Sequence, residues 1–155
     1  MTYDELLAEV YTITNRADLT AETALAVKSA TLFFHTMDYF EKDLFESGIQ
    51  FDTSSYLQSL AYRTLLPRWR DIKYLRKYDA VGDTAGKFLT EIATEKVLNA
   101  YGVERKDVFY LAGAVYQLKS STAEQYYLIG AYLNPDINPA TFDSWIALEQ
   151  PYAIV

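Results

Sequence analysis

The sequence predicts an α+β fold, in which an N-terminal antiparallel helix pair and a C-terminal helix form a helical bundle beside an antiparallel β-sheet of about 4–6 strands. Two observations predict it: apolar residues recur at helical spacing near both ends of the chain, and alternating, tyrosine-rich segments fill the middle. The 155 residues are expected to form a single domain, because this length suits one hydrophobic core and no linker or repeat interrupts it. The expected domain, 1–155, comprises a helical pair (about 3–38), a β-rich part (about 45–133), a C-terminal helix (about 139–149) and an apolar tail (151–155).

The N-terminal helices are predicted from caps and spacing. Thr2 followed by Glu5 forms a capping-box pattern, and apolar residues then recur at helical spacing, so a helix is expected at about 3–15. A second helix, at about 20–38, contains many small residues that allow another backbone to approach closely, which favours an antiparallel pair. His35, the one histidine, lies late in this helix and is interpreted as a surface or capping residue rather than a catalytic base.

The middle of the chain is predicted to be mostly strands. Alternation before a polar loop predicts a strand near 45–52, and the basic stretch 70–78 is predicted to be a strand with one polar face. A flexible turn is expected over the glycines of 82–86. The remaining expectations are a short strand at 88–92, a short helix from Glu95 to Tyr101 ended by Gly102, a β-hairpin at 108–118 and a neighbouring strand at 126–133.

The C-terminal region combines a helix and an apolar tail. Asn138 followed by Pro139 is a strong start signal, which predicts a helix at about 139–149. The last five residues, Pro-Tyr-Ala-Ile-Val, are expected either to dock into the fold or to engage a partner.

Composition excludes several kinds of chemistry. The chain has no cysteine and one histidine, so disulfides, thiol catalysis and thiolate metal sites are excluded, and no calcium-loop pattern is present. Neither a phosphate-binding glycine loop nor a Gly-x-Ser-x-Gly elbow occurs, so no catalytic, metal or cofactor-binding residues are assigned and the chain is not expected to be an enzyme. Paired carboxylates stay possible, although the candidates Glu41, Asp43, Asp136 and Asp143 are interpreted as ordinary surface acids.

Neither a signal peptide nor a membrane-spanning helix is expected from the sequence. The start of the chain is acidic and lacks the pattern of a signal peptide, and no apolar run approaches the roughly 18 residues that a membrane helix needs.

Charge is concentrated in one stretch. The net charge is −7, but residues 63–78 hold six basic residues and one acid, so this segment carries +5 and the rest of the chain −12. The basic stretch is either a solvated strand face or a surface for an anionic partner. The candidate partner-binding residues are Arg68, Arg70, Lys73, Arg76 and Lys77, together with Tyr152, Ile154 and Val155 at the C-terminus.

Several segments together resemble a known family. They are Asp18-Leu19 before Ala-Val-Lys-Ser-Ala-Thr-Leu at 26–32, the central segment 66–74, Tyr127-Leu128-Ile129-Gly130, the segment 138–147, and the final Pro-Tyr-Ala-Ile-Val. In this combination the chain resembles the head-to-tail adaptor (connector or neck) proteins of tailed bacteriophages. The similarity covers most of the chain, with the Ser-Trp-Ile-Ala segment followed by Pro-Tyr as its most specific part.

The resemblance implies a structural virion protein with a helical bundle and a β-rich part. Such adaptors are made in the host cytoplasm and assemble in the virion neck as a ring under the portal protein, usually of twelve copies. They join the capsid to a downstream tail or neck protein and extend a channel through which DNA passes without sequence-specific binding. It implies no cofactor and no membrane partner.

Two other functions stay open from the sequence. One is another neck or tail-completion protein of the same virion, which sequence separates poorly from an adaptor. The other is a small α+β ligand-binding domain or enzyme with an aromatic pocket, which the 14 tyrosines permit.

Overall fold

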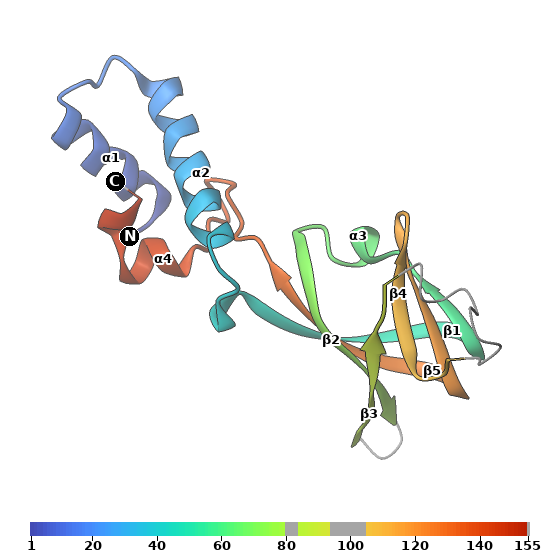
Figure 1. Ribbon diagram of the computed structural model, residues 1–155. Helices are drawn as coiled ribbons and strands as arrows, with labels where there is room; N and C mark the ends of the chain where they lie inside the picture. Colours follow the sequence, from blue (N-terminus) through green and yellow to red (C-terminus); the bar gives the residue numbers. More distant parts are fainter. Residues whose placement is uncertain (80–83, 94–104, 155) are drawn as a thin grey trace. The chain divides into compact units, whose positions relative to one another are not determined.

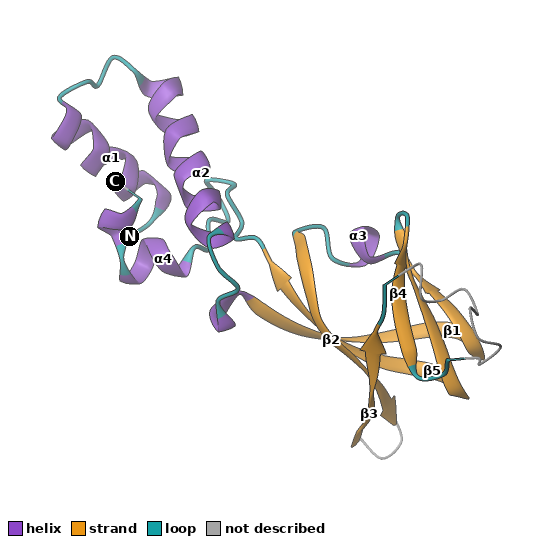
Figure 2. Cartoon of the chain, in the orientation of Figure 1, coloured by secondary structure: helices purple, strands orange, loops and turns teal. Residues whose placement is uncertain are grey.

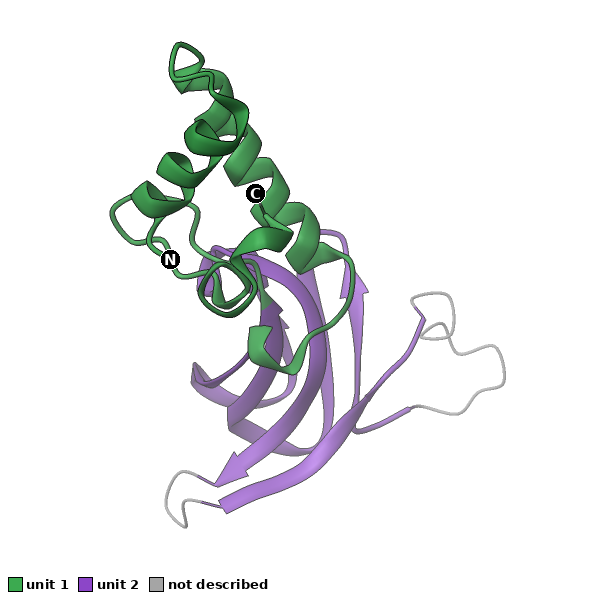
Figure 3. Ribbon diagram, turned by 90° about the vertical axis from the view of Figure 1, so that its left-hand side faces the viewer, with its two compact units in different colours: residues 1–43, 133–155 green, residues 44–132 purple. Residues whose placement is uncertain are grey.

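The computed structural model describes residues 1–79, 84–93 and 105–154, drawn as a ribbon in Figure 1. The chain forms two compact units, a helical unit of Met1–Asp43 with Leu133–Val155 and a barrel unit of Leu44–Tyr132, coloured separately in Figure 3. Figure 2 shows the helices in purple and the strands in orange. The expectation of a single domain stays a prediction.

The helical unit begins with the two expected N-terminal helices. These are α1, Tyr3–Thr14, and α2, Thr20–Thr36. The capping box that starts α1 is present, because Glu5 N donates to Thr2 Oγ1 over 3.3 Å and Thr2 N donates to Glu5 Oε2 over 2.7 Å. The unit is completed by a short 3-10 turn η1, Glu41–Asp43, the helix α4, Trp145–Glu149, and a second turn η3, Pro151–Ala153.

The predicted C-terminal helix at 139–149 is wrong over its first half, because α4 begins only at Trp145. Asn138 does not cap a long helix. Its side-chain oxygen accepts from Ala140 N over 3.1 Å, which is a local turn, and Ser144 caps α4 instead by accepting from Ala147 N over 3.2 Å. Short polar side chains stabilise such turns as readily as helix starts, so the sequence signal marked a turn.

The core of the helical unit joins segments from both ends of the chain. Tyr3 and Leu6 from α1 and Val27 from α2 pack in one buried cluster with Ile146, Ala147 and Ile154. Of the two outcomes expected for the apolar tail, docking holds for Ile154, whereas Tyr152 is 74% exposed. Val155 lies outside the described residues.

The barrel unit contains five strands. They are β1, Leu44–Leu60, β2, Trp69–Asp79, β3, Thr84–Glu91, β4, Val108–Ala112, and β5, Val115–Leu133, with a short helix α3, Tyr62–Leu65, between β1 and β2. The sheet order is β1-β5-β2-β3-β4, and β4 also pairs with β5. Strands β5, β2, β3 and β4 therefore close into a four-stranded barrel, and β1 pairs with β5 beside it (Figure 1).

The predicted fold class, a helical bundle with an open antiparallel sheet, is wrong. Strands hold 43% of the described residues and close into a barrel, and the helices are few and short. One pairing is parallel, between β3 and β4 with Thr90 opposite Val108, and this pairing closes the ring. Closing a sheet into a barrel removes the unpaired edges that an open sheet would expose.

Two strands are longer than predicted, and this explains part of the error. The polar run before Tyr126 does not interrupt β5, and the Asp-Thr-Ser-Ser segment does not end β1. Their pairing shifts register between Gln50 and Ser55 and again between Ser55 and Leu57. Such irregularities bend a strand and let it wrap around a barrel.

Other local predictions hold. The central strand expected at 70–78 is present as β2, and the hairpin expected at 108–118 is β4 with the start of β5, with Gly113 at φ 65° in its turn. The turn expected at 82–86 is wrong at its end, because β3 begins at Thr84. The expected helix from Glu95 to Tyr101 and its terminal Gly102 lie outside the described residues.

Candidate functional site

The basic stretch lies on β2 and in the turn before it, and the structure does not gather its charges on one face. Neighbouring side chains of a strand point to opposite faces, so a run of charges along a strand is divided by geometry. Arg68 and Lys73 are exposed, whereas Arg70, Arg76 and Lys77 are partly buried. The stretch therefore has an N-terminal half, Arg68 to Lys73, and a C-terminal half, Arg76 and Lys77, with different surroundings.

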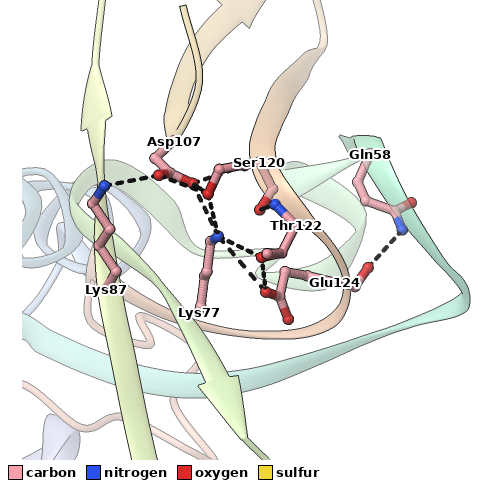
Figure 4. Close-up of polar contacts among 8 residues, drawn as sticks. Gln58, Lys77, Lys87, Asp107, Ser120, Thr122 and Glu124 are labelled. Atoms are coloured by element: carbon pink, nitrogen blue, oxygen red, sulfur yellow. Dashed lines mark hydrogen bonds and ion pairs between the residues drawn. The ribbon is translucent and has the colours of Figure 1, made fainter.

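Lys77 belongs to a polar network (Figure 4). Its Nζ lies 2.9 Å from Asp107 Oδ1 and donates to the hydroxyl oxygens of Ser121 and Thr122 over 3.1 and 2.8 Å. Lys87 Nζ approaches the other oxygen of Asp107 at 2.8 Å. The Lys77 side chain is only 12% exposed, so its charge is compensated within the chain.

Asp107 is the centre of this network. Burial opposes its ionisation, but hydrogen bonds from Lys87, the Ser121 backbone and Lys77 outweigh burial and hold the pKa of the Asp107 carboxyl well below its usual range. Asp107 also has a positive φ of 54°, a conformation that aspartate tolerates better than most residues. The carboxylate is thus kept ionised as a fixed partner for two lysines.

Arg76 is held on the barrel surface by Tyr74, Phe88 and Glu46. Its guanidinium lies 3.3 Å from Glu46 Oε2 and over the rings of Tyr74 and Phe88, at 5.7 and 5.5 Å from their centroids. The Tyr74 hydroxyl also donates to Glu46, and burial together with this bond raises the pKa of Tyr74. The Tyr74 ring fills the space over Gly130, where an added Cβ would lie 2.4 Å from it.

In the N-terminal half, two cationic side chains lie over an aromatic ring. The Arg70 guanidinium and the Lys73 ammonium lie over the same ring, that of Tyr132, at 6.0 and 5.7 Å from its centroid. The ring face attracts a cation in this position without neutralising its charge.

An aromatic pocket adjoins this half. It has a volume of about 490 Å³ and is lined by Tyr62, Arg63, Pro67, Trp69, Arg70, Asp71, Leu111 and Tyr116. Tyr62, Trp69 and Tyr116 form one cluster, with centroid separations of 4.7, 5.1 and 5.8 Å. Burial, with the nearby charges of Glu91 and Asp71, raises the pKa of Tyr116 to about 12, so this phenol stays protonated.

Sequence reasoning missed the residues that complete this pocket. Arg63 was counted in the basic segment but was not a candidate, and the structure places it on the short helix α3. Tyr116 comes from β5, and no local pattern predicts that β5 meets the end of β1 and the start of β2. The one usable signal was the pairing of aromatic and basic residues in Arg63, Trp69 and Arg70.

The helical unit carries an exposed apolar face on α2. Leu25 and Phe33 are 66% and 60% exposed, and the small residues Ala26 and Ser29 lie between them on the same side of the helix. The opposite side, which is buried, carries Thr23, Val27, Thr31 and His35. The exposed side of α2 is therefore more apolar than is usual for a helix whose outer face contacts only water.

His35 is the clearest error among the predicted side-chain roles. It is 1% exposed, with Nδ1 2.8 Å from Asp43 Oδ1 and Nε2 2.9 Å from Ser144 Oγ. Trp145 Nε1 also donates to Asp43 Oδ1 over 2.7 Å, so Asp43 is a buried acid and not the surface acid expected. The acid–histidine–serine order is that of a hydrolase triad, but Ser144 is 1% exposed and its Oγ caps α4. This cluster joins α2, η1 and α4.

Among the described residues, no three acid or histidine side chains lie close enough to hold a metal ion. None of the helices in the described part of the chain is long and apolar enough to cross a membrane. No protein-family model matches the sequence, and no curated protein matches it.

Proposed function

We propose that this chain is a structural assembly protein, the head-to-tail adaptor of a tailed bacteriophage, which forms a ring under the portal protein in the virion neck. The ring joins the capsid to a downstream tail or neck protein and extends the DNA channel. The resemblance of several segments to such adaptors suggests the family, and the observations below support a role in protein assembly.

The exposed face of α2 is the observation that carries the proposal. Leu25 and Phe33 are 66% and 60% exposed, and Met37, which follows the helix, is 63% exposed. Single exposed apolar residues are ordinary, but a series of them along one helix face, with small residues between, is typical of a protein–protein interface.

The charge distribution supports the same role. A net charge of −7 disfavours binding to DNA, because the phosphate backbone attracts proteins through clustered, uncompensated lysine and arginine. Of the five basic candidates, Arg76 and Lys77 already contact Glu46 and Asp107. An acidic wall that repels DNA suits a channel through which DNA slides without binding.

The face of α2 can be tested with one matched pair of substitutions. Phe33→Asp should abolish co-sedimentation of the purified chain with purified portal, because the new carboxylate would be buried against the partner without a pairing group. Ile13→Asp is the control, since Ile13 on α1 is also 60% exposed. Equal loss in both variants, or no loss in either, would contradict the role of α2.

Another neck or tail-completion protein is the alternative within the same virion. It would also need apolar contact surfaces, so the α2 face does not separate it from an adaptor. Binding partners separate the two: an adaptor binds portal without any tail component, whereas a tail-completion protein binds only a tail or an assembled neck.

A further inference from the structure

The aromatic pocket beside the N-terminal half of β2 is the feature that neither the fold nor the α2 face explains. Its rim carries the guanidinium groups of Arg63 and Arg70 and one carboxylate, Asp71, and its floor is the ring cluster of Tyr62, Trp69 and Tyr116. A volume of about 490 Å³ is sufficient for one or two side chains of a partner.

The rings are arranged for a side chain and not for a nucleic-acid base. A base is usually held by stacking on the face of an open ring. Here the rings pack against one another, tilted by 49° between Tyr62 and Trp69 and by 56° between Tyr62 and Tyr116. They form a continuous apolar wall, against which an aliphatic group or a proline can lie.

Arg63 supplies the polar half of the site. It is an exposed residue of α3, and its guanidinium lies over the Tyr62 ring at 5.7 Å from the centroid. A ring beneath a guanidinium orients the planar group and leaves its edge to donate two parallel hydrogen bonds to a carboxylate. The pocket therefore pairs an orientated donor with an apolar wall.

We propose that this pocket binds an acidic segment of a second copy of this chain, with a carboxylate held by Arg63 and the adjacent apolar side chain against Tyr62 and Trp69. Charge complementarity argues for a second copy, because the charged side chains that line the pocket are two arginines and one aspartate, whereas the chain as a whole carries a net charge of −7. A contact between two different surfaces of identical chains closes into a ring when its rotation allows. The inference rests on the proposed function, since it names a contact between neighbouring subunits of the ring.

Photocrosslinking of the chain alone, at high concentration and without portal, tests this contact. A photoreactive phenylalanine analogue at Leu111, a partly exposed residue of the pocket wall, should give a covalent dimer, and mass spectrometry of its peptides should place the crosslink on an acidic segment of the second copy. A crosslink to a segment without acids, or no dimer at all, would overturn the proposal.

Charge substitution gives an independent readout. By sedimentation, Arg63→Glu should weaken self-association ~10-fold or more, and Arg63→Gln less, because a hydrogen bond between charged groups is lost and then replaced by repulsion. Arg16→Glu is the matched control, since Arg16 is an exposed arginine of the helical unit that pairs with Asp18. Equal weakening by Arg16→Glu would show a general charge effect and contradict the pocket.

The outcomes separate the pocket from the adaptor role. If the chain self-associates through the pocket but does not bind portal, the adaptor role is rejected and the pocket contact is supported. If the chain binds portal but its Arg63→Glu variant self-associates normally, the adaptor role is supported and the proposed pocket contact is rejected. Saturable binding of ATP, used as a probe of nucleotide ligands, that is abolished by Arg63→Glu would also reject the second copy as the occupant.

Discussion

The two halves of β2 contain the same residue types and use them differently. In the C-terminal half, Lys77 is enclosed by Asp107, Ser121 and Thr122, and Arg76 contacts Glu46. In the N-terminal half, Arg70 and Lys73 lie over the Tyr132 ring, and the adjacent pocket opens to solvent. A run of positive charge in a sequence therefore says little about binding until the partners of each charge are known. The C-terminal half stabilises the barrel, whereas the N-terminal half adjoins the aromatic pocket.

The largest expected effect is that of removing Lys77. Lys77→Ala leaves the buried Asp107 carboxylate with one lysine fewer, which should lower the free energy of unfolding by about 2–4 kcal/mol. Denaturant unfolding at pH 7 measures this change. Lys73→Ala on the same strand is the control and should cost less, because Lys73 is exposed whereas Lys77 is only 12% exposed. Similar losses for Lys73 and Lys77 would remove the difference between the two halves.

A smaller effect is expected at Gly130, which fixes the position of Tyr74 and Glu46. A Cβ at Gly130 would lie 2.4 Å from the Tyr74 ring, so Gly130→Ala should displace the ring and cost about 1–3 kcal/mol. Gly48→Ala on β1 is the matched control, because an added Cβ there has no neighbour within 4 Å. Thermal unfolding of the two variants should rank them in this order, and equal midpoints would contradict the packing of Tyr74.

The pH dependence of stability should also come from the C-terminal half. The folded pKa of Asp107 lies below the unfolded value of about 3.9, so its contribution is complete above that pH and is lost as pH falls through the folded pKa. Between pH 5 and about pH 2, the wild type should lose stability more steeply than Asp107→Asn. If the free energy of unfolding fell equally steeply with pH in both proteins, Asp107 would not be the source of the pH dependence between pH 5 and about pH 2.

The smallest stability effect is expected at Arg68, in the N-terminal half. Arg68→Ala removes an exposed side chain in the turn before β2 and should change the free energy of unfolding by less than about 0.5 kcal/mol. The same variant should weaken binding to portal if this half meets an acidic partner. A large loss of stability without a loss of binding would reverse the assignment of the two halves.

Local patterns in the sequence were sufficient for the elements whose stabilisation is local. The capping box of Thr2 and Glu5 predicted α1, and alternation predicted β2. They failed where distant segments decide the outcome. Closure of the barrel depends on the pairing of Thr90 with Val108, and no periodicity within either segment indicates a parallel partner.

The candidate site was predicted only in part, again because distant segments decide the surroundings of its side chains. The basic stretch was located from composition, but the division of its charges depends on Glu46 and Asp107, which lie on distant segments. His35 was assigned to the surface by its place late in a helix, whereas Asp43 and Ser144 bury it. Ser144 is 109 residues away in sequence, so that burial has no local signature.

Electron microscopy of the purified chain mixed with purified portal tests the adaptor role most directly. We predict a closed ring of this chain at the base of the portal, coaxial with its channel. A chain that stays unbound under conditions where the portal ring is intact would contradict the role.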